Sequence, residues 1–119
     1  KIKRKLDVEW SKAIRERDKI CQKCGKTRST QAAHIFSRGH LSTRWDKRNG
    51  IGLCYYCHII WAHRNPVEFT LWVQKRLGDV FEKLKKLAES VYSETNLRVP
   101  SEVERIQKQL VEIQIKKWT

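Results

Sequence analysis

Apolar positions repeat at helical spacing near the start of the chain and again after residue 64. Trp10 and Ile14 lie four residues apart within residues 8–19, which predicts a helix with one buried face. Asn65-Pro66 combines a capping residue with proline at a first helical position, and Gly78 is a typical end. The apolar residues between these signals predict a second helix: Phe69, Trp72, Val73 and Leu77.

Two capping boxes predict further helices in the last third of the chain. Asp79 with Glu82 opens the first, whose apolar stripe is Val80, Leu84, Leu87 and Val91. Ser101 with Glu104, just after Pro100, opens the second, whose stripe is Val103, Ile106, Leu110, Ile113 and Trp118. We interpret these stripes as helix-packing surfaces, with a homodimer interface through the C-terminal helices as the alternative.

The middle of the chain has a different pattern. Residues 20–58 hold all four cysteines and three of the four histidines, with little helical periodicity before Cys54. Residues 31–36 and 50–53 favour short strands. We therefore expect an α+β protein in three segments: a basic arm and helix over 1–19, a compact core over 20–64, and a helical tail over 65–119 that packs on the core or on a partner. The arm is residues 1–7.

The charge is strongly positive and uneven. The 119 residues include 26 Lys and Arg against 13 Asp and Glu, a formal charge of +13. Residues 1–48 hold 15 of the basic and 5 of the acidic groups. A concentrated excess of this kind favours a polyanionic partner that meets the N-terminal half, because each neutralised phosphate releases counterions. A basic surface that serves only solubility is the alternative.

No apolar run approaches the roughly 18–20 residues that span a membrane. The basic start is not followed by the apolar segment of a signal peptide. These features favour a cytoplasmic protein, in a bacterial or phage-infected cell, without a membrane partner.

All four cysteines fall in two Cys-x2-Cys pairs, Cys21 with Cys24 and Cys54 with Cys57. Two such pairs in a reducing compartment predict one tetrahedral, structural Zn²⁺ site with four thiolate ligands. Two disulfides or a thioredoxin-like redox pair are the alternatives. The 29 residues between the pairs exceed the usual spacing of a zinc ribbon, so we expect the function to lie in this insert.

Three polar residues stand at regular places around the predicted strands. His34 ends the first strand, Asn49 precedes the second, and His58 directly follows the last cysteine. Together with Ala33-His34-Ile35, residues 43–49, Cys54-x2-Cys57 and the helix from Asn65 to Gly78, they give residues 21–69 a resemblance to the HNH (His-Me finger) nucleases. Within that group the chain is most similar to the phage NinG-type recombination proteins.

The resemblance implies a ββα-metal core, here with a zinc knuckle, and hydrolysis of DNA by a one-metal mechanism. It makes His34 the general base, which suits an imidazole whose pKa is near neutral. It makes His58 a ligand of a catalytic divalent metal, with Mg²⁺ or Mn²⁺ expected. Asn49 would orient the loop that holds His34, or contribute to the metal site. The expected substrate is DNA, including branched or structured DNA in phage recombination, and RNA is not excluded.

One position departs from the family pattern. Many HNH proteins place an aspartate metal ligand directly before the catalytic histidine, where this chain has Ala33. His63 is the leading replacement and Asp46 the second. His58 and His63 are five residues apart, about 140° around an ideal α-helix, so sharing an ion would require the helix to end between them.

Each of these residues also has a plainer interpretation. His34 can be a buried structural histidine, His58 an alternative zinc ligand, Asn49 a turn residue and His63 a helix cap. The basic residues of the insert suit phosphate contacts, and Trp45 among them suits either base stacking or the core. We assign these as nucleic-acid-binding residues: Arg38, Arg44, Trp45, Lys47 and Arg48.

Two other functions compete with the nuclease. The chain can be a non-catalytic zinc module that binds nucleic acid, as Ala33 hints. It can also be a protein-interaction adaptor built on the helical tail, although the large positive charge of the chain does not favour this function.

Overall fold

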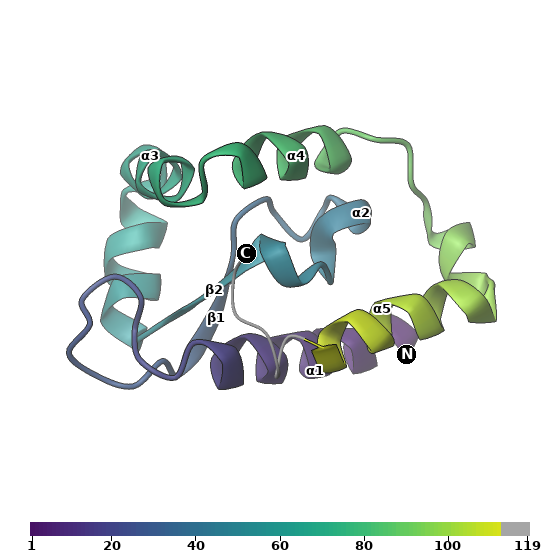
Figure 1. The fold of residues 1–119 in the computed structure, drawn as a ribbon, viewed down its shortest axis with the longest axis horizontal. Helices are drawn as coiled ribbons and strands as arrows, with labels where there is room; N and C mark the ends of the chain where they lie inside the picture. Colours follow the sequence, from purple (N-terminus) through teal and green to yellow (C-terminus); the bar gives the residue numbers. More distant parts are fainter. Residues whose placement is uncertain (113–119) are drawn as a thin grey trace.

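The computed structural model describes residues 1–112 of the chain, which form a small α+β protein (Figure 1). A two-stranded antiparallel sheet lies at the centre and helices surround it. This agrees with the predicted fold class. The expected Ile113 and Trp118 positions lie outside the described residues.

The N-terminal helix α1 spans Ile2–Arg17, so the prediction of a separate arm over residues 1–7 is wrong. Leu6 is fully buried beside Trp10 and Ile14, and this apolar face holds the first turns against the rest of the protein. Burial of one amphipathic face stabilises a helix more than intrinsic propensity does, which explains why the lysine-rich start is helical.

The sheet pairs β1 (Gln31–His34) with β2 (Gly50–Leu53), with His34 opposite Gly50 and Gln31 opposite Leu53. The first strand is two residues shorter than predicted. Helix α1 packs so closely on Gly50 that a Cβ there would lie 2.5 Å from Trp10 Cζ2. The buried Arg17 side chain donates hydrogen bonds to the carbonyls of Lys47 and Gly50, which joins the end of α1 to the sheet.

The segment between the strands is more helical than its sequence suggested. It contains α2 (Leu41–Arg44) and a 3₁₀ turn η1 (Lys47–Asn49). The side chain of Asp46 caps η1 by accepting a hydrogen bond from the Arg48 amide. These turns lack the apolar periodicity of a longer helix, so pattern alone did not reveal them.

After β2 the chain enters a π-helix, η2 (Tyr56–Ala62), and then α3 (Pro66–Leu77) and α4 (Asp79–Ala88). The predicted limits of α3 are confirmed, and Gly78 follows it with a positive φ of 56°. Gly78, rather than the Asp79 side chain, occupies the N-cap of α4. The prediction that Val91 belongs to its buried stripe is wrong, because α4 ends at Ala88 and Val91 is fully exposed.

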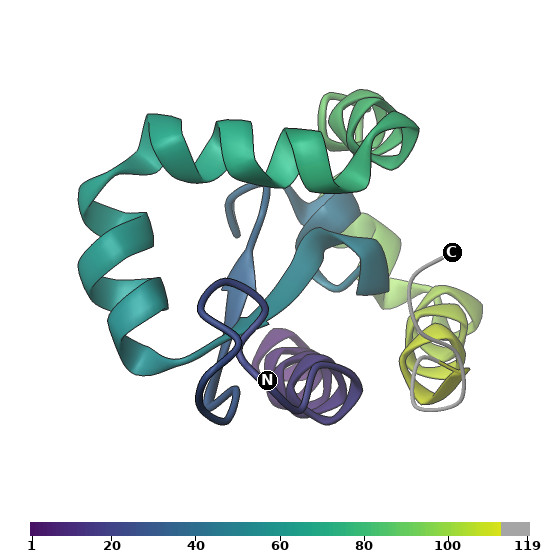
Figure 2. The same cartoon turned by 60° about the vertical axis from the view of Figure 1, so that its left-hand side comes forward.

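A short 3₁₀ segment η3 (Glu94–Arg98) leads to α5 (Pro100–Glu112), which returns to lie beside α1 (Figures 1 and 2). Pro100 begins this helix, so Ser101 is inside it instead of capping it. Ile106 and Leu110 are buried in one core cluster with Leu6 and Trp10 of α1. The described part of the C-terminal stripe therefore packs within the chain, and the homodimer stays an untested alternative.

A second core cluster lies on the other side of the sheet, where Ile51 and Leu53 meet Phe69 and Val73 of α3. The predicted tail thus packs on the predicted core from both sides. Within residues 1–112 no helix has the length and apolar character needed to cross a bilayer.

Candidate functional site

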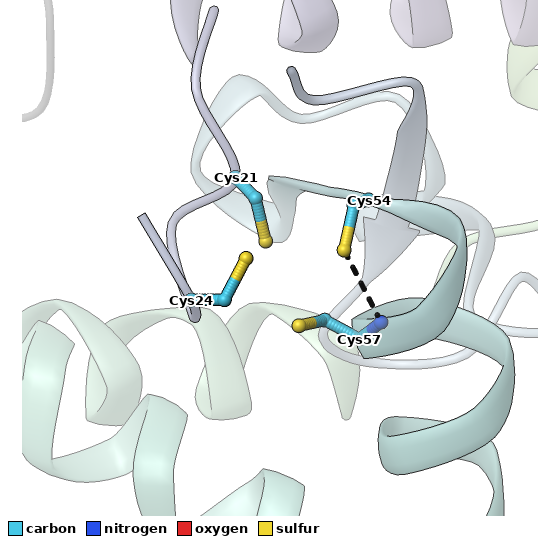
Figure 3. Close-up of side chains that lie close together, drawn as sticks. All are labelled: Cys21, Cys24, Cys54 and Cys57. Atoms are coloured by element: carbon cyan, nitrogen blue, oxygen red, sulfur yellow. Dashed lines mark hydrogen bonds between the residues drawn. The ribbon is translucent and has the colours of Figure 1, made fainter. Parts of the chain in front are cut away.

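The four cysteines form one cluster (Figure 3). Their sulfur atoms all lie within 4.8 Å of one another, although one pair precedes β1 in the sequence and the other follows β2. A tetrahedral ion with Zn–S bonds of about 2.3 Å needs sulfur–sulfur distances of roughly 3.8 Å. The four thiols are therefore close enough to hold one metal ion.

Local backbone geometry explains how each pair turns around this point. After Cys21 the chain folds back on itself, and Gly25, at a φ of 67°, donates its amide to the Cys21 carbonyl over 2.9 Å. Cys54 directly follows β2, and the Cys57 amide points at its sulfur, 3.4 Å away. Amide donors directed at sulfur stabilise a thiolate, the form that binds metal.

The pKa values of these thiols show the same environment. Burial opposes ionisation of Cys21, but backbone amides of Cys24, Cys54 and Lys23 outweigh it and lower its pKa to about 6. Burial and the neighbouring sulfurs raise the pKa of the Cys57 thiol. Four thiolates so close together would repel one another, so the full set needs a cation at its centre.

A separate cleft of about 880 Å³ is lined by none of the four cysteines. Its walls come from α1, β1, η2, the start of α3 and the loop at residues 37–39. His34, His58 and His63 all line it. The predicted juxtaposition of residues 34 and 58 in one cleft is thus present in the fold.

His34 is held on two sides. Its ring stacks on Trp10 with centroids 3.9 Å apart and planes within 8°. Its Nε2 lies 2.9 Å from the Arg44 carbonyl, which can only accept a hydrogen bond, so Nε2 carries the proton of the neutral ring. Nδ1 is then left with the free lone pair. Burial lowers the pKa of His34 and favours this neutral form.

His58 is oriented in a similar way. Its Nδ1 lies 2.7 Å from Gln31 Oε1, and an amide oxygen only accepts, so Nδ1 donates. Nε2 then has the free lone pair. Burial, with smaller effects of His63 and His34, lowers the pKa of His58 to about 4, so its ring is neutral near pH 7.

The π-helical geometry of η2 brings His63 to His58. The His63 amide bonds to the His58 carbonyl five residues back, so residue 63 lies about one turn above residue 58. Their ring centroids are 4.6 Å apart. The expectation that they could meet only if the helix ended between them is wrong, because a wider helix aligns them instead.

The other replacement for the absent aspartate is not at the site. Asp46 is buried, pairs with Arg48 and does not line the cleft. Among residues 1–112, the four cysteines are the only group of three or more potential protein ligands within reach of one ion. No described carboxylate therefore completes a three-ligand group with His58 and His63.

Asn49 is fully buried and connects three points of the insert. Its Oδ1 accepts a hydrogen bond from the Phe36 amide, and its Nδ2 donates to the carbonyls of Phe36 and Thr43. The Asn49 carbonyl also accepts from Ile35. These contacts fit the role of orienting the loop after His34, and they use both Nδ2 hydrogens and one lone pair of Oδ1.

The five residues assigned to nucleic-acid binding lie in different parts of the structure. Arg38 lines the cleft and is 63 % exposed. Trp45 is 2 % exposed and donates its indole hydrogen to Asp7, so the assignment of base stacking to Trp45 is wrong and its place is in the core. Arg44 also binds Asp7, whereas Lys47 and Arg48 do not line the cleft.

Sequence reasoning missed Asp7, Trp10 and Gln31 as residues of this region. Asp7 lies on α1 and accepts hydrogen bonds from Arg38, Arg44 and Trp45. Burial opposes its ionisation, but these donors and charges outweigh it and hold the pKa of Asp7 below its usual value. The helical spacing of Asp7 with Trp10 was the one available signal, and the interpretation of residues 1–7 as an arm concealed it.

No protein-family model matches this chain, and no curated protein or solved structure matches it significantly. The resemblance to the HNH nucleases therefore rests on the sequence motifs.

Proposed function

We propose that this protein is an HNH-type endonuclease with a structural Zn²⁺ at its four cysteines, a ββα-metal core built on β1, β2 and η2, and a catalytic divalent metal at His58. The observation that carries the proposal is the pairing of two oriented imidazoles in one cleft. His34 offers Nδ1 and His58 offers Nε2, each because its other nitrogen is committed to an oxygen acceptor.

His34 would act as the general base. Its Nδ1 would take a proton from water as the water oxygen attacks phosphorus. The bond from phosphorus to the 3′ oxygen would break, and that oxygen would take a proton from solvent water. The products are a 3′-hydroxyl and a 5′-phosphate. The stack on Trp10 and the bond to the Arg44 carbonyl fix the ring, so little reorganisation is needed when it accepts the proton.

His58 and His63 would hold the catalytic metal, with water and substrate phosphate as the remaining ligands. A bound divalent ion supplies charge stabilisation for the phosphate and the departing oxygen. Gln31 would keep the His58 ring in the ligating orientation. Arg38, at the rim of the same cleft, suits a contact with the phosphate that is cut.

Nicking of supercoiled plasmid in Mg²⁺ or Mn²⁺ tests this proposal. We expect wild-type protein to convert the plasmid to the open-circular form, and His34→Ala to abolish nicking while binding to the plasmid is retained. His40→Ala is the matched control, because His40 is exposed and does not line the cleft.

A non-catalytic zinc module that binds nucleic acid is the second candidate. The favouring observation is that Ala33 and the neighbouring residues bring no carboxylate to the His58–His63 pair. This alternative predicts that wild-type protein and His34→Ala bind the plasmid equally and that neither nicks it with any divalent metal.

A further inference from the structure

A second groove begins where the cleft ends. Its volume is about 870 Å³, and it shares Asp7 and Arg38 with the cleft that holds the histidines. The rest of its wall is the first turns of α1 together with Arg44. An extended ligand bound in the histidine cleft would therefore continue into this groove where it passes Arg38.

The groove is lined mainly by cations. Six of its nine residues are basic, against the carboxylates of Asp7 and Glu9: Lys1, Lys3, Arg4, Lys5, Arg38 and Arg44. Asp7 is already bound by Arg38 and Arg44, and Lys3 pairs with Glu94. Lys1, Arg4 and Lys5 are exposed and have no ion pair within residues 1–112.

This cluster of positive charges lowers the stability of the protein unless an anion binds to it. Like charges at helical spacing on one face of a helix repel each other. The turn is nevertheless fixed in place, because Leu6 and Trp10 bury its other face. The cations are thus held in order along a concave surface before any partner arrives.

We propose that this groove, which we call the α1 groove, is the track along which the DNA backbone continues from the proposed cleavage site. The inference rests on the proposed function. Arg38 stands at the junction, where it can exchange Asp7 for a phosphate without leaving its place. Contacts from Lys and Arg to phosphates carry no sequence preference, so the α1 groove sets the affinity and the direction of the strand.

The test compares two variants that lose the same charge from opposite sides of the molecule. Arg4→Gln/Lys5→Gln alters the α1 groove. Lys83→Gln/Lys86→Gln alters exposed residues on α4, which lies across the sheet from α1 in both views (Figures 1 and 2). Both are made in the full chain carrying His34→Ala, so that cleavage does not disturb the binding measurement.

The measurement is the affinity for a fluorescent 20-base-pair DNA duplex as a function of salt. Each lost phosphate contact lowers the slope of log affinity against log salt by about 0.9. For the groove variant we expect the magnitude of this slope to be smaller than that of the parent by about 1.8. Over a fourfold rise in salt, the factor by which its affinity falls should therefore be roughly twelve times smaller than the factor for the parent. The α4 variant should keep the parent slope.

Equal slopes for the two variants would overturn the α1 groove and leave net charge as the explanation. Phosphatidylserine vesicles test a membrane surface as the other polyanion. The groove would also be rejected as a DNA track if Arg4→Gln/Lys5→Gln lost binding to these vesicles while its DNA binding stayed at the parent level. The nuclease is judged separately, by plasmid nicking with His34 intact. A reduced salt slope in the groove variant, without any plasmid nicking by the protein, supports the groove and rejects the nuclease. Nicking together with an unchanged salt slope supports the nuclease and rejects the groove.

Discussion

The rings of His58 and His63 lie 4.6 Å apart because the helix that carries them closes its hydrogen bonds over five residues. In an α-helix the same two positions would point about 140° away from each other. A π-helix costs stability relative to an α-helix and is frequent at functional sites. Its presence around the last cysteine, Cys57, favours a role for the pair as ligands.

The amide of Gln31 is expected to matter for metal affinity at this pair. Gln31→Ala removes the acceptor that fixes the His58 tautomer, and loss of such a partner weakens metal binding by roughly 10–100-fold. Titration of the protein with Mn²⁺, followed by paramagnetic resonance or calorimetry, measures this. The four thiols should be saturated with Zn²⁺ beforehand.

Gln31→Glu is the informative companion variant, because a carboxylate at the same place still accepts from Nδ1 and should restore most of the affinity. Mn²⁺ should bind more tightly than Mg²⁺, since Mg²⁺ is a hard cation that prefers oxygen ligands to imidazole nitrogen. Unaltered Mn²⁺ affinity in Gln31→Ala would show that His58 is not a ligand.

Motifs and periodicity predicted the parts of this fold in which local signals and packing agree. The Cys-x2-Cys pairs predicted the cluster, and Asn65-Pro66 with Gly78 gave the exact limits of α3. Asn49 was assigned to the loop after His34 because an amide both donates and accepts, and its three hydrogen bonds agree with this.

The parts that were missed depend on contacts between distant residues. Trp45 was assigned to DNA from its basic neighbours, but Asp7, 38 positions earlier, draws it into the core. The helical state of residues 2–7 depends on Leu6 meeting α5, which no local pattern reports. The alignment of His58 with His63 depends on a helix type that apolar periodicity does not distinguish.

Removal of the metal from the cysteine cluster should unfold the protein. A structural Zn²⁺ contributes about 10–16 kcal/mol of folding free energy, and the whole stability of such a domain is about 5–15 kcal/mol. We expect one Zn²⁺ per chain by elemental analysis, and loss of the near-ultraviolet circular dichroism of the tryptophans after chelation. Cys54→Ser should behave like the chelated protein.

The comparison that decides the point is the thermal midpoint before and after chelation under reducing conditions. A metal-free chain with the midpoint of the untreated protein would mean that the cluster is only a set of buried thiols.

The acid limit of nicking should follow the ionisation of His34. Burial lowers its pKa from 6.5, so the base stays neutral as pH falls through 6.5, and the rate declines only below the lowered value. The unfolded chain takes up this proton first. The stability contributed by neutral His34 is therefore present above pH 6.5 and is lost as pH falls through the window between 6.5 and the folded pKa.

Trp10→Leu exposes the ring and should move both the acid limit of the rate and the His34 titration, read by NMR, up toward 6.5. His40→Ala should move neither. An acid limit that stays in place while the NMR titration moves would assign the rate-limiting proton to another group.

A methyl group added at Gly50, on the strand opposite His34, should shift the His34 ring. The added Cβ would lie 2.5 Å from Trp10 Cζ2 and 2.8 Å from two Ile14 carbons, so the stack of Trp10 on His34 must shift. Overpacking of this kind costs about 1–3 kcal/mol. We expect Gly50→Ala to lower the free energy of unfolding in urea by that amount and to slow nicking at saturating DNA.

Gly39→Ala is the matched control for stability, because its Cβ would meet only Ser37 Oγ at an ordinary 3.7 Å. The two effects of Gly50→Ala can be separated by adding Ile14→Val, which relieves part of the crowding on the side away from the stack. Recovery of stability without recovery of the rate would place the catalytic loss in the position of Trp10. A Gly50→Ala protein that is destabilised but nicks DNA at the wild-type rate would contradict any dependence of His34 on its stacking partner.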